Sequence, residues 1–196
     1  SFMNTSATIT LNSISFSNPR AIVDFEDDGT FETCAADVCS NVSLSGTTAT
    51  FNVTHFTSFS TQDVLSCGNI TTSGLHTLSQ NLTSIGTCIN VTVSNVIIDG
   101  AGYFIVGSGS GAGILSIGRT NVTIANLTIM NYTTGIYFSN TDASRVLDVN
   151  LSRNSGGLLL DVGSDNNIIT RLIANNNTNN GVRLSTSFDN LFINAN

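Results

Sequence analysis

The sequence predicts an all-β protein in which a solenoid of short parallel strands, residues 63–196, follows a small β domain, residues 1–62. Three observations support this fold class. A pattern of asparagine, a few apolar residues and glycine returns every 22 to 26 residues from residue 91 onward. The apolar runs are three to five residues long and β-branched, which is too short for the helices of an α-solenoid. The segment 1–62 lacks the repeat. Internal repeats of this length are typical of solenoids.

Two rows of predicted strands make up the repeat. The first row comprises Ser94-Asn95-Val96-Ile97-Ile98, Thr120-Asn121-Val122-Thr123-Ile124, Ser144-Arg145-Val146-Leu147, Asn166-Asn167-Ile168-Ile169 and Asp189-Asn190-Leu191-Phe192-Ile193. The second row comprises Gly113-Ile114-Leu115-Ser116-Ile117, Gly135-Ile136-Tyr137-Phe138, Gly157-Leu158-Leu159-Leu160 and Gly181-Val182-Arg183-Leu184. Strands that pair with their copies one coil later are parallel, and Gly and Asn tolerate the corners between them.

Alternation of side chains along each strand predicts which positions face the interior. Two inward ladders are predicted in the second row, Ile114, Ile136, Leu158 and Val182, and Ser116, Phe138, Leu160 and Leu184. The residues between them are predicted to point outward, namely Leu115, Tyr137, Leu159 and Arg183. The first row predicts a further inward ladder of Val96, Val122, Val146, Ile168 and Leu191.

Two features of the repeat need separate interpretation. Asp148 falls where Ile98, Ile124 and Ile193 are predicted to point inward, so we expect a local slip of register there. Asn131, Asn154 and Asn177 are evenly spaced, about one coil apart. Their amides either stack along the solenoid, bonding backbone or one another, or belong to ordinary exposed turns.

The repeat resembles the NosD-like or CASH-type right-handed parallel β-helix family, as found in archaeal extracellular surface proteins. The resemblance rests on residues 121–138 and 175–184, and residues 67–103 are similar to the opening turn of such helices. It covers about residues 64–196 and implies a right-handed parallel β-helix. It implies no activity, because the same coil supports lyases, hydrolases, epimerases, adhesins and scaffolds.

Residues 1–62 are expected to form a compact, β-sandwich-like unit of short strands. The expected strands are Ala7–Phe16, Ala21–Phe25, Thr48–Val53 and Phe56–Phe59. Turns are predicted at Asp28-Gly29 and Ser45-Gly46, and the junction with the solenoid at residues 60–63. The closing run, residues 50–59, resembles the last strand of small β domains of archaeal extracellular proteins.

Four cysteines allow three disulfide connectivities. We expect two local disulfides, because Cys34 and Cys39 close a tight loop and Cys67 and Cys88 lie about one coil apart. Such bonds indicate an oxidising compartment. A zinc site is the alternative, but the spacing of Cys34 and Cys39 lacks the second close pair that such sites use.

Composition restricts the partners and the compartment. The net charge is −7, the pI is about 4.3 and lysine is absent, which argues against nucleic acid as a partner. No apolar run approaches a membrane span, and no signal peptide is evident. We expect a processed or partial chain. Eleven Asn-x-Ser/Thr sequons predict an extracellular glycoprotein; they are Asn4, Asn41, Asn52, Asn69, Asn81, Asn90, Asn121, Asn126, Asn131, Asn150 and Asn176.

No catalytic constellation is evident, so no enzyme activity and no cofactor are expected. His55 and His76 are interpreted as strand or turn residues. No two of the solenoid's aspartates are expected at adjacent positions on one outward face; these are Asp99, Asp142, Asp148, Asp161, Asp165 and Asp189. Asp161 and Arg183 are interpreted as a structural salt bridge.

An acidic segment and a glycine-rich segment each resemble a ligand-binding site, but both are interpreted as turns. Carboxylates of one acidic stretch could ligate calcium, although a hairpin turn with solvated carboxylates is the simpler interpretation; the stretch contains Asp24, Glu26, Asp27 and Asp28. The segment Gly107–Gly113 is interpreted as a corner, because neither a helix nor Lys follows it as in a phosphate-binding loop.

These observations favour a glycosylated structural protein of the cell surface, an S-layer-like, sheath or filament subunit or an adhesin. The expected partners are copies of itself, assembled head to tail through the solenoid ends, and possible surface glycans. The alternatives are a carbohydrate-active enzyme and a carbohydrate-binding module. The first lacks a carboxylate cluster, and the second lacks the usual exposed aromatic strip, since Trp is absent and Tyr occurs three times.

Overall fold

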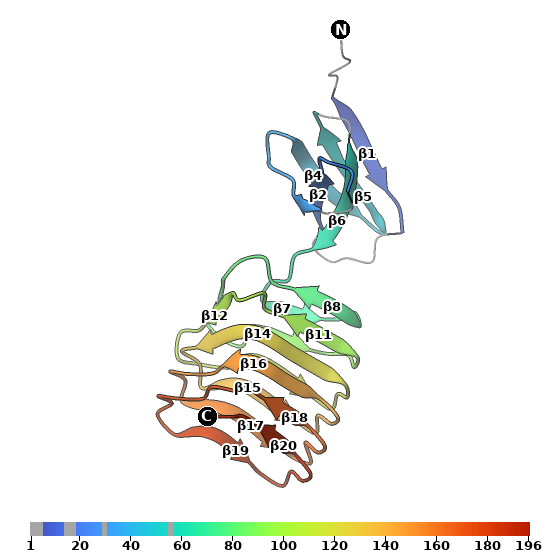
Figure 1. Cartoon of the computed structure of the whole chain (residues 1–196). Coiled ribbons are helices and arrows are strands. Elements are labelled where there is room, and N and C mark those ends of the chain that lie inside the picture. The colour runs from blue at the N-terminus through green and yellow to red at the C-terminus, as the bar shows by residue number, and fades with distance from the viewer. Residues whose placement is uncertain (1–5, 14–18, 29–30, 55–56) are drawn as a thin grey trace. The chain divides into compact units, whose positions relative to one another are not determined.

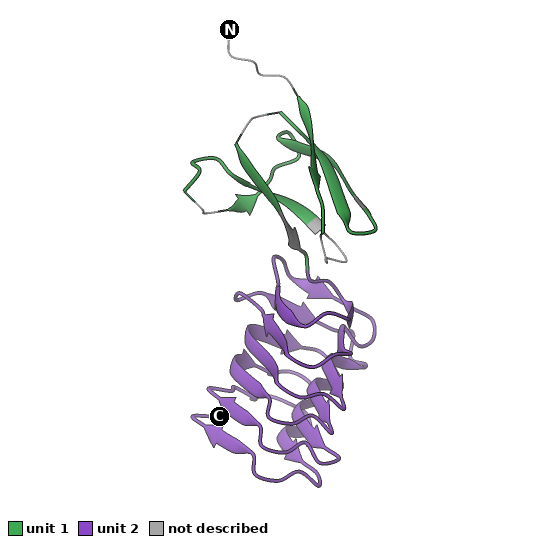
Figure 2. Ribbon diagram, turned by 90° about the vertical axis from the view of Figure 1, so that its right-hand side faces the viewer, with its two compact units in different colours: residues 1–64 green, residues 65–196 purple. Residues whose placement is uncertain are grey.

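The computed structural model describes residues 6–13, 19–28, 31–54 and 57–196, and within these ranges every regular element is a β-strand (Figure 1). The chain divides into two compact units, residues 1–64 and residues 65–196 (Figure 2). We call them the N-terminal unit and the coil unit. None of the described residues belongs to a helix that could cross a membrane.

The N-terminal unit contains two three-stranded antiparallel sheets, as expected of a sandwich-like domain. One sheet has the order β1-β5-β4 and the other β3-β2-β6. The strands are β1 (Ala7–Leu11), β2 (Pro19–Asp24), β3 (Glu32–Thr33), β4 (Cys39–Ser45), β5 (Thr48–Val53) and β6 (Ser58–Asp63). Val23, Phe51 and Val53 are buried, and the Phe51 ring meets the Phe59 ring edge-on with centroids 6.0 Å apart. This aromatic contact joins the two sheets.

Three strand predictions in this unit were wrong in their bounds, and one of them, predicted at Ala21–Phe25, is Pro19–Asp24. The first strand ends at Leu11; residues 14–18 lie outside the described part, as does Phe56. The last strand extends to Asp63, so the predicted junction at residues 60–63 is part of β6. The prediction omitted β4, whose side chains at Ser40, Val42 and Ser43 are exposed. Its residues 42–45 do alternate between apolar and polar, but a register irregularity between Ser40 and Ser43 interrupts its pairing with β5.

The coil unit is a parallel β-helix of six coils. Its first sheet has the order β19-β17-β15-β13-β10-β7, and the second follows β20-β18-β16-β14-β11-β8, with β9 and β12 joining at its side. All registered pairs are parallel. The strands are β7 (Gly68–Ile70), β8 (Gly74–Thr77), β9 (Leu82–Thr83), β10 (Ile89–Val91), β11 (Val96–Asp99), β12 (Phe104–Val106), β13 (Ala112–Ile117), β14 (Val122–Met130), β15 (Thr134–Ser139), β16 (Arg145–Asn150), β17 (Gly156–Asp161), β18 (Ile168–Thr170), β19 (Asn180–Leu184) and β20 (Leu191–Ile193).

The ladders predicted for the first of these sheets are confirmed, with one exception. Ile114, Ile136, Leu158 and Val182 are paired in consecutive coils. Ser116, Phe138 and Leu160 form the second inward ladder and are buried. Its last predicted member, Leu184 in the final coil, is 45% exposed.

The ladder predicted for the other sheet was wrong beyond Val122. Val146 pairs with Ile124 instead, and the ladder continues through Ile169 and Phe192. The expected local slip at Asp148 was wrong, because β14 and β16 pair in one continuous register; instead, the whole strand β16 is displaced by two residues from the predicted alignment. The displacement arises because the coil after Val122 is shorter than the coil before it, 22 residues against 26. Asp148 consequently lies opposite Asn126 at an outward corner, both at φ 54.

Candidate functional site

Buried polar side chains join consecutive coils at three corners. Ser144 Oγ accepts the N–H of Val122, and Asn167 Oδ1 accepts the N–H of Ser144, at 2.9 and 2.8 Å. Asn190 continues this column. Backbone N–H groups buried without a partner would destabilise the fold. These side chains therefore have a structural role.

The predicted column of Asn131, Asn154 and Asn177 was wrong by one residue at its first position. Asn154 Oδ1 accepts the N–H of Tyr132 and Asn177 Oδ1 that of Asn154, at 3.0 and 2.8 Å. Asn131 is exposed and left-handed (φ 63), with its Nδ2 donating to the Gly107 carbonyl. A third column of such caps runs through Thr141, Ser164 and Ser187.

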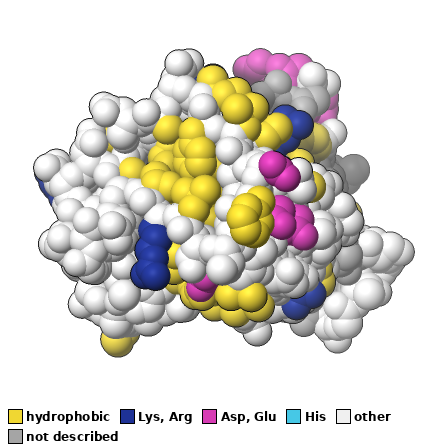
Figure 3. All heavy atoms as spheres, turned by 90° about the horizontal axis from the view of Figure 1, so that it is seen from below, with side chains coloured by type: hydrophobic (Ala, Val, Ile, Leu, Met, Phe, Trp, Pro, Cys, Tyr) yellow, Lys and Arg dark blue, Asp and Glu magenta, His cyan; other side chains and the backbone are white. Residues whose placement is uncertain are grey.

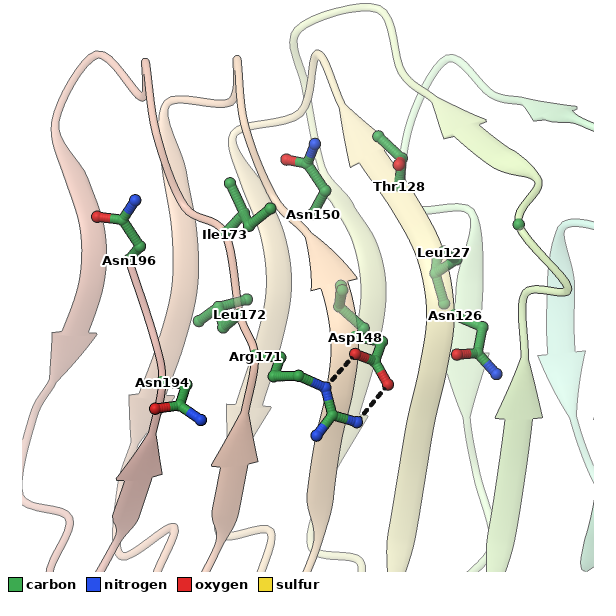
Figure 4. Close-up of a pocket in the computed structure, with 12 residues that line it drawn as sticks. Asn126, Leu127, Thr128, Asp148, Asn150, Arg171, Leu172, Ile173, Asn194 and Asn196 are labelled. Carbon is green, nitrogen blue, oxygen red and sulfur yellow. Dashed lines mark hydrogen bonds and ion pairs between the residues drawn. The ribbon is translucent and has the colours of Figure 1, made fainter.

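Outward side chains of a second kind follow one corner of the helix. Asn126, Asp148, Arg171 and Asn194 occupy equivalent corner positions in four successive coils, all with positive φ. Two residues further along each coil lies a parallel outward column of Thr128, Asn150, Ile173 and Asn196. We call these the corner column and the flanking column (Figure 4).

A hollow of about 580 Å³ lies along the two columns. Buried Leu127, Val149 and Leu172 lie between them and contribute to its lining. The hollow is therefore bordered by amide, hydroxyl, carboxylate and guanidinium groups from successive coils, while these three side chains themselves are buried in the core. No sequence pattern marked it, because its members are spread over several coils and its columns depend on the register of β16.

An ion pair lies in the middle of the corner column. Arg171 donates from Nε and Nη2 to the two carboxylate oxygens of Asp148, the second bond measuring 2.6 Å (Figure 4). Hydrogen bonding to Arg171 lowers the pKa of Asp148 below its ordinary 3.8, against a smaller effect of desolvation. Bidentate Arg–carboxylate pairs fix both side chains geometrically. The pair also leaves no net charge at this point of the hollow.

The acidic stretch of the N-terminal unit does not assemble a metal site in the described residues. Asp24 Oδ1 accepts the N–H of Asp28, and Asp27 Oδ1 accepts bonds from the N–H and hydroxyl of Ser58. Across the described ranges, no three His, Cys, Asp or Glu residues are grouped to hold a metal ion. The carboxylates of Asp24 and Asp27 thus stabilise a turn and the neighbouring strand, whereas Glu26 is exposed.

The expectation that no two aspartates occupy adjacent outward positions was wrong. Asp142 and Asp165 are equivalent in consecutive coils, because Asp142 Oδ1 accepts the N–H of Asp165 at 3.0 Å. Asp165 Oδ1 in turn accepts the N–H of Phe188. The shortened coil after Val122 shifted this pair relative to the aligned strands, so the sequence alignment missed it. Both carboxylates bond backbone rather than facing a common space.

Asp161 interacts mainly through hydrogen bonds, and no Asp161–Arg183 salt bridge occurs among the described contacts. It accepts a bond from Tyr137 Oη at 3.2 Å. Its pKa is lowered first by a hydrogen bond from Ser185, with Arg183 the smallest contribution. His76 is buried, with Nε2 2.9 Å from the Thr72 carbonyl, and His55 lies outside the described residues. Gly109 and Gly111 have positive φ, consistent with a corner.

Both cysteine pairs form disulfides, Cys34–Cys39 in the N-terminal unit and Cys67–Cys88 in the coil unit. Cys88 is buried in the core of the β-helix, next to Ile89. The second bond therefore ties the first coil to the next. Disulfides of this kind are typical of secreted proteins.

The sequons are distributed over both units. Asn4 lies outside the described residues. Exposed sites are Asn41, Asn69, Asn81, Asn121, Asn126, Asn131 and Asn176, and half-buried sites are Asn52, Asn90 and Asn150. Asn69 and Asn90 are paired in adjacent coils, with the Asn90 amide donating to Asn69 at 3.0 Å.

The last coil presents apolar side chains at the end of the β-helix. Phe188 is 66% exposed, and Leu184, Leu191 and Ile193 are also exposed. Figure 3, seen from below relative to Figure 1, shows hydrophobic side chains gathered on this end among polar ones.

Six parallel coils with internal polar ladders and a disulfide define a right-handed parallel β-helix of the periplasmic or extracellular type. The model of one family, described as periplasmic copper-binding protein (NosD), matches residues 67–196. The chain belongs to the NosD family. Comparisons with curated proteins and with solved structures gave no significant match.

The described residues do not fit a copper site. Copper in proteins takes thiolate, thioether and imidazole ligands. The four cysteines are all disulfide-bonded, the Nε2 of His76 lies 2.9 Å from the Thr72 carbonyl, and Met130 is the one methionine among the described residues.

Proposed function

We propose that this protein is a non-catalytic structural subunit of an extracellular surface, that it carries N-linked glycans, and that its copies assemble head to tail through the ends of the β-helix. One observation carries the structural role. Polar side chains that recur at adjacent positions hold backbone groups of the neighbouring coil, as Asp142, Asn154 and Asn167 do. Such a helix is a stiff rod with few reactive groups.

The exposed apolar end of the coil unit supports the assembly. Burial of Phe188 and the three aliphatic side chains beside it would remove apolar surface from water, which is favourable in proportion to area. The unpaired edges of β19 and β20 would add main-chain hydrogen bonds. A contact between unlike ends is heterologous, and contacts of this kind extend into filaments unless they close into rings.

Electron microscopy of the purified chain tests the assembly. We expect filaments whose axial repeat is close to the length of one molecule. Leu184→Asp should disperse them, since Leu184 continues the inward ladder of Leu160 and is exposed in the last coil. Leu75→Asp, on the outward face of the first coil, should leave them intact. Dispersed monomers at high concentration, with the intact chain confirmed by mass, would contradict head-to-tail assembly.

Mass spectrometry of glycopeptides from the native source tests the glycan part. We expect glycans on exposed sequons such as Asn81, Asn126 and Asn131. An entirely unmodified chain would refute this part of the proposal while leaving the assembly to its own experiment.

A further inference from the structure

We propose that a glycan linked to Asn81 packs its first sugar on the ring of Phe104, and that this contact clips the first coil of the β-helix, β7 to β9, to the second, β10 to β12. The inference rests on the N-glycosylation proposed above and gives one of its sites a structural role. Asn81 begins the sequon Asn81-Leu82-Thr83 and is exposed. Phe104 is an aromatic residue of the second coil and is 41% exposed.

The side chains of Asn81 and Phe104 lie on the same outward face in adjacent coils. Leu82 of β9 pairs with Ile105 of β12, and both are buried. Side chains alternate along a strand, so the residue before each of them points outward. Neighbouring parallel strands lie about 4.8 Å apart. A sugar attached to Asn81 therefore stands beside the Phe104 ring.

A hydrogen bond orients the Asn81 amide. Its Oδ1 accepts the backbone N–H of Phe104 at 2.9 Å, whereas its Nδ2, the atom that carries an N-linked glycan, has no hydrogen bond among the described contacts. Three other exposed sequon asparagines donate from Nδ2 instead, namely Asn121, Asn126 and Asn131. The Asn81 amide is thus held in place with its acceptor nitrogen available.

Glycan attachment preserves this arrangement. The reaction is a group transfer from a glycosyl phosphate donor, in which Nδ2 forms a bond to the anomeric carbon. The bond from that carbon to the phosphate oxygen breaks, its electron pair stays with the phosphate, and one Nδ2 proton passes to a base of the transferase. The amide keeps its second N–H and its carbonyl oxygen, so the bond from the Phe104 N–H to Oδ1 persists.

Phe104 offers the attached sugar an apolar surface. In the column of outward residues its neighbour on the other side is Thr128 of the third coil. A pyranose ring has a face rich in C–H groups, and packing that face on an aromatic ring removes apolar surface of both from water. The sugar would therefore cover part of a ring that the protein leaves exposed.

The contact falls where the coils are joined by a short strand pairing. β9 has two residues, is the shortest strand of the coil unit and pairs with β12. Short pairings provide few main-chain hydrogen bonds, so such a segment opens locally at a lower cost than the core strands. A sugar linked to β9's coil and packed on β12 opposes this opening, as the Cys67–Cys88 bond does elsewhere in the first coil.

The test is a double-mutant cycle on the full chain secreted by insect cells, with glycopeptide mapping to establish which sequons are occupied. Thr83→Ala abolishes the sequon but keeps the Asn81 side chain, and Phe104→Thr removes the ring. Guanidinium titration followed by circular dichroism gives the equilibrium constant for unfolding. We expect Phe104→Thr to raise this constant about tenfold in the glycosylated chain, and about twofold when Thr83→Ala is also present.

Thr123→Ala is the matched control, because it abolishes the sequon of Asn121, whose amide lies against Asn95 rather than an aromatic ring. Phe104→Thr should keep its tenfold effect in that background. The inference is overturned if Asn81 is bare while other sequons carry glycans, or if Phe104→Thr has the same effect with and without Thr83; both results leave the chain a glycoprotein. A chain with no glycan at any sequon would refute the glycan proposal and this inference together.

Discussion

Truncating Ile136 to Ala is the sharpest test of how the coils are held together. Ile136 is 0% exposed and lies in the inward ladder between Ile114 and Leu158. The change removes three carbon atoms, and at about 0.8 kcal/mol each their transfer free energy is about 2.4 kcal/mol. A cavity adds to this, because parallel pairing on both sides restrains β15 from moving into the space. We expect a total loss of about 4 kcal/mol in the free energy of unfolding, within the range of about 2 to 5 kcal/mol for such truncations.

The matched control is the next residue, on the opposite face of the same strand. Tyr137 is half-buried among Leu115 and Leu159, and its hydroxyl donates to Asp161. Tyr137→Ala removes a larger side chain but only cross-strand contacts, so we expect a loss of about 1 kcal/mol. Guanidinium titration followed by far-UV circular dichroism measures both variants. Equal losses, or a larger loss at Tyr137, would show that burial does not distinguish the two faces and would refute the reasoning.

Three further outcomes follow from other features of the chain. Replacing Cys67 and Cys88 by serine should lower the stability of the coil unit by about 3 kcal/mol, the value for a loop of this length; peptide mapping without reductant should first recover the pair as one cross-linked fragment. Val162→Asn should stabilise by about 1 kcal/mol, since Val162 is exposed at φ 50 and β-branched residues are strained there; an unchanged melting temperature would contradict this. The lowered pKa of Asp148 means that its pair with Arg171 stabilises the fold above the ordinary pKa of 3.8 and loses this effect as the pH falls through the lowered value; NMR titration should show that pKa rising in Arg171→Met.

Much of the first sheet could be predicted from the sequence because its coils have nearly constant length. The glycines before Ile114, Ile136 and Leu158 are evenly spaced, so aligning them aligns the strands. The alternation of side chains then distinguishes the inward positions from the outward ones. The fold class and the inward positions of this sheet could therefore be predicted from the regular spacing.

The other sheet and the hollow could not be predicted, because apolar similarity misled the alignment. Val146 resembles Val122 in sequence, but the residue that lies opposite Val122 one coil later is Ser144, whose hydroxyl accepts the Val122 N–H. The valine and the serine have unlike side chains but occupy equivalent positions in consecutive coils, as the strand register and this hydrogen bond show. Correcting this register is what brings Asp148 beside Asn126 and Arg171, and with them the outward columns.

The buried caps have a consequence for how such a helix can change its length. Ser144, Asn167 and Asn190 are 23 residues apart, as are Asn154 and Asn177, and each cap is supplied to one coil by the coil that follows it. Inserting a single residue between two successive caps, such as Ser144 and Asn167, would misplace the second of them unless a corner absorbs it, as corners do where coils differ in length. Duplicating a complete coil would instead repeat the whole set of partners. Growth and shortening of this rod during evolution should therefore occur in whole coils, and its reach from a surface should be quantised in steps of about 4.8 Å.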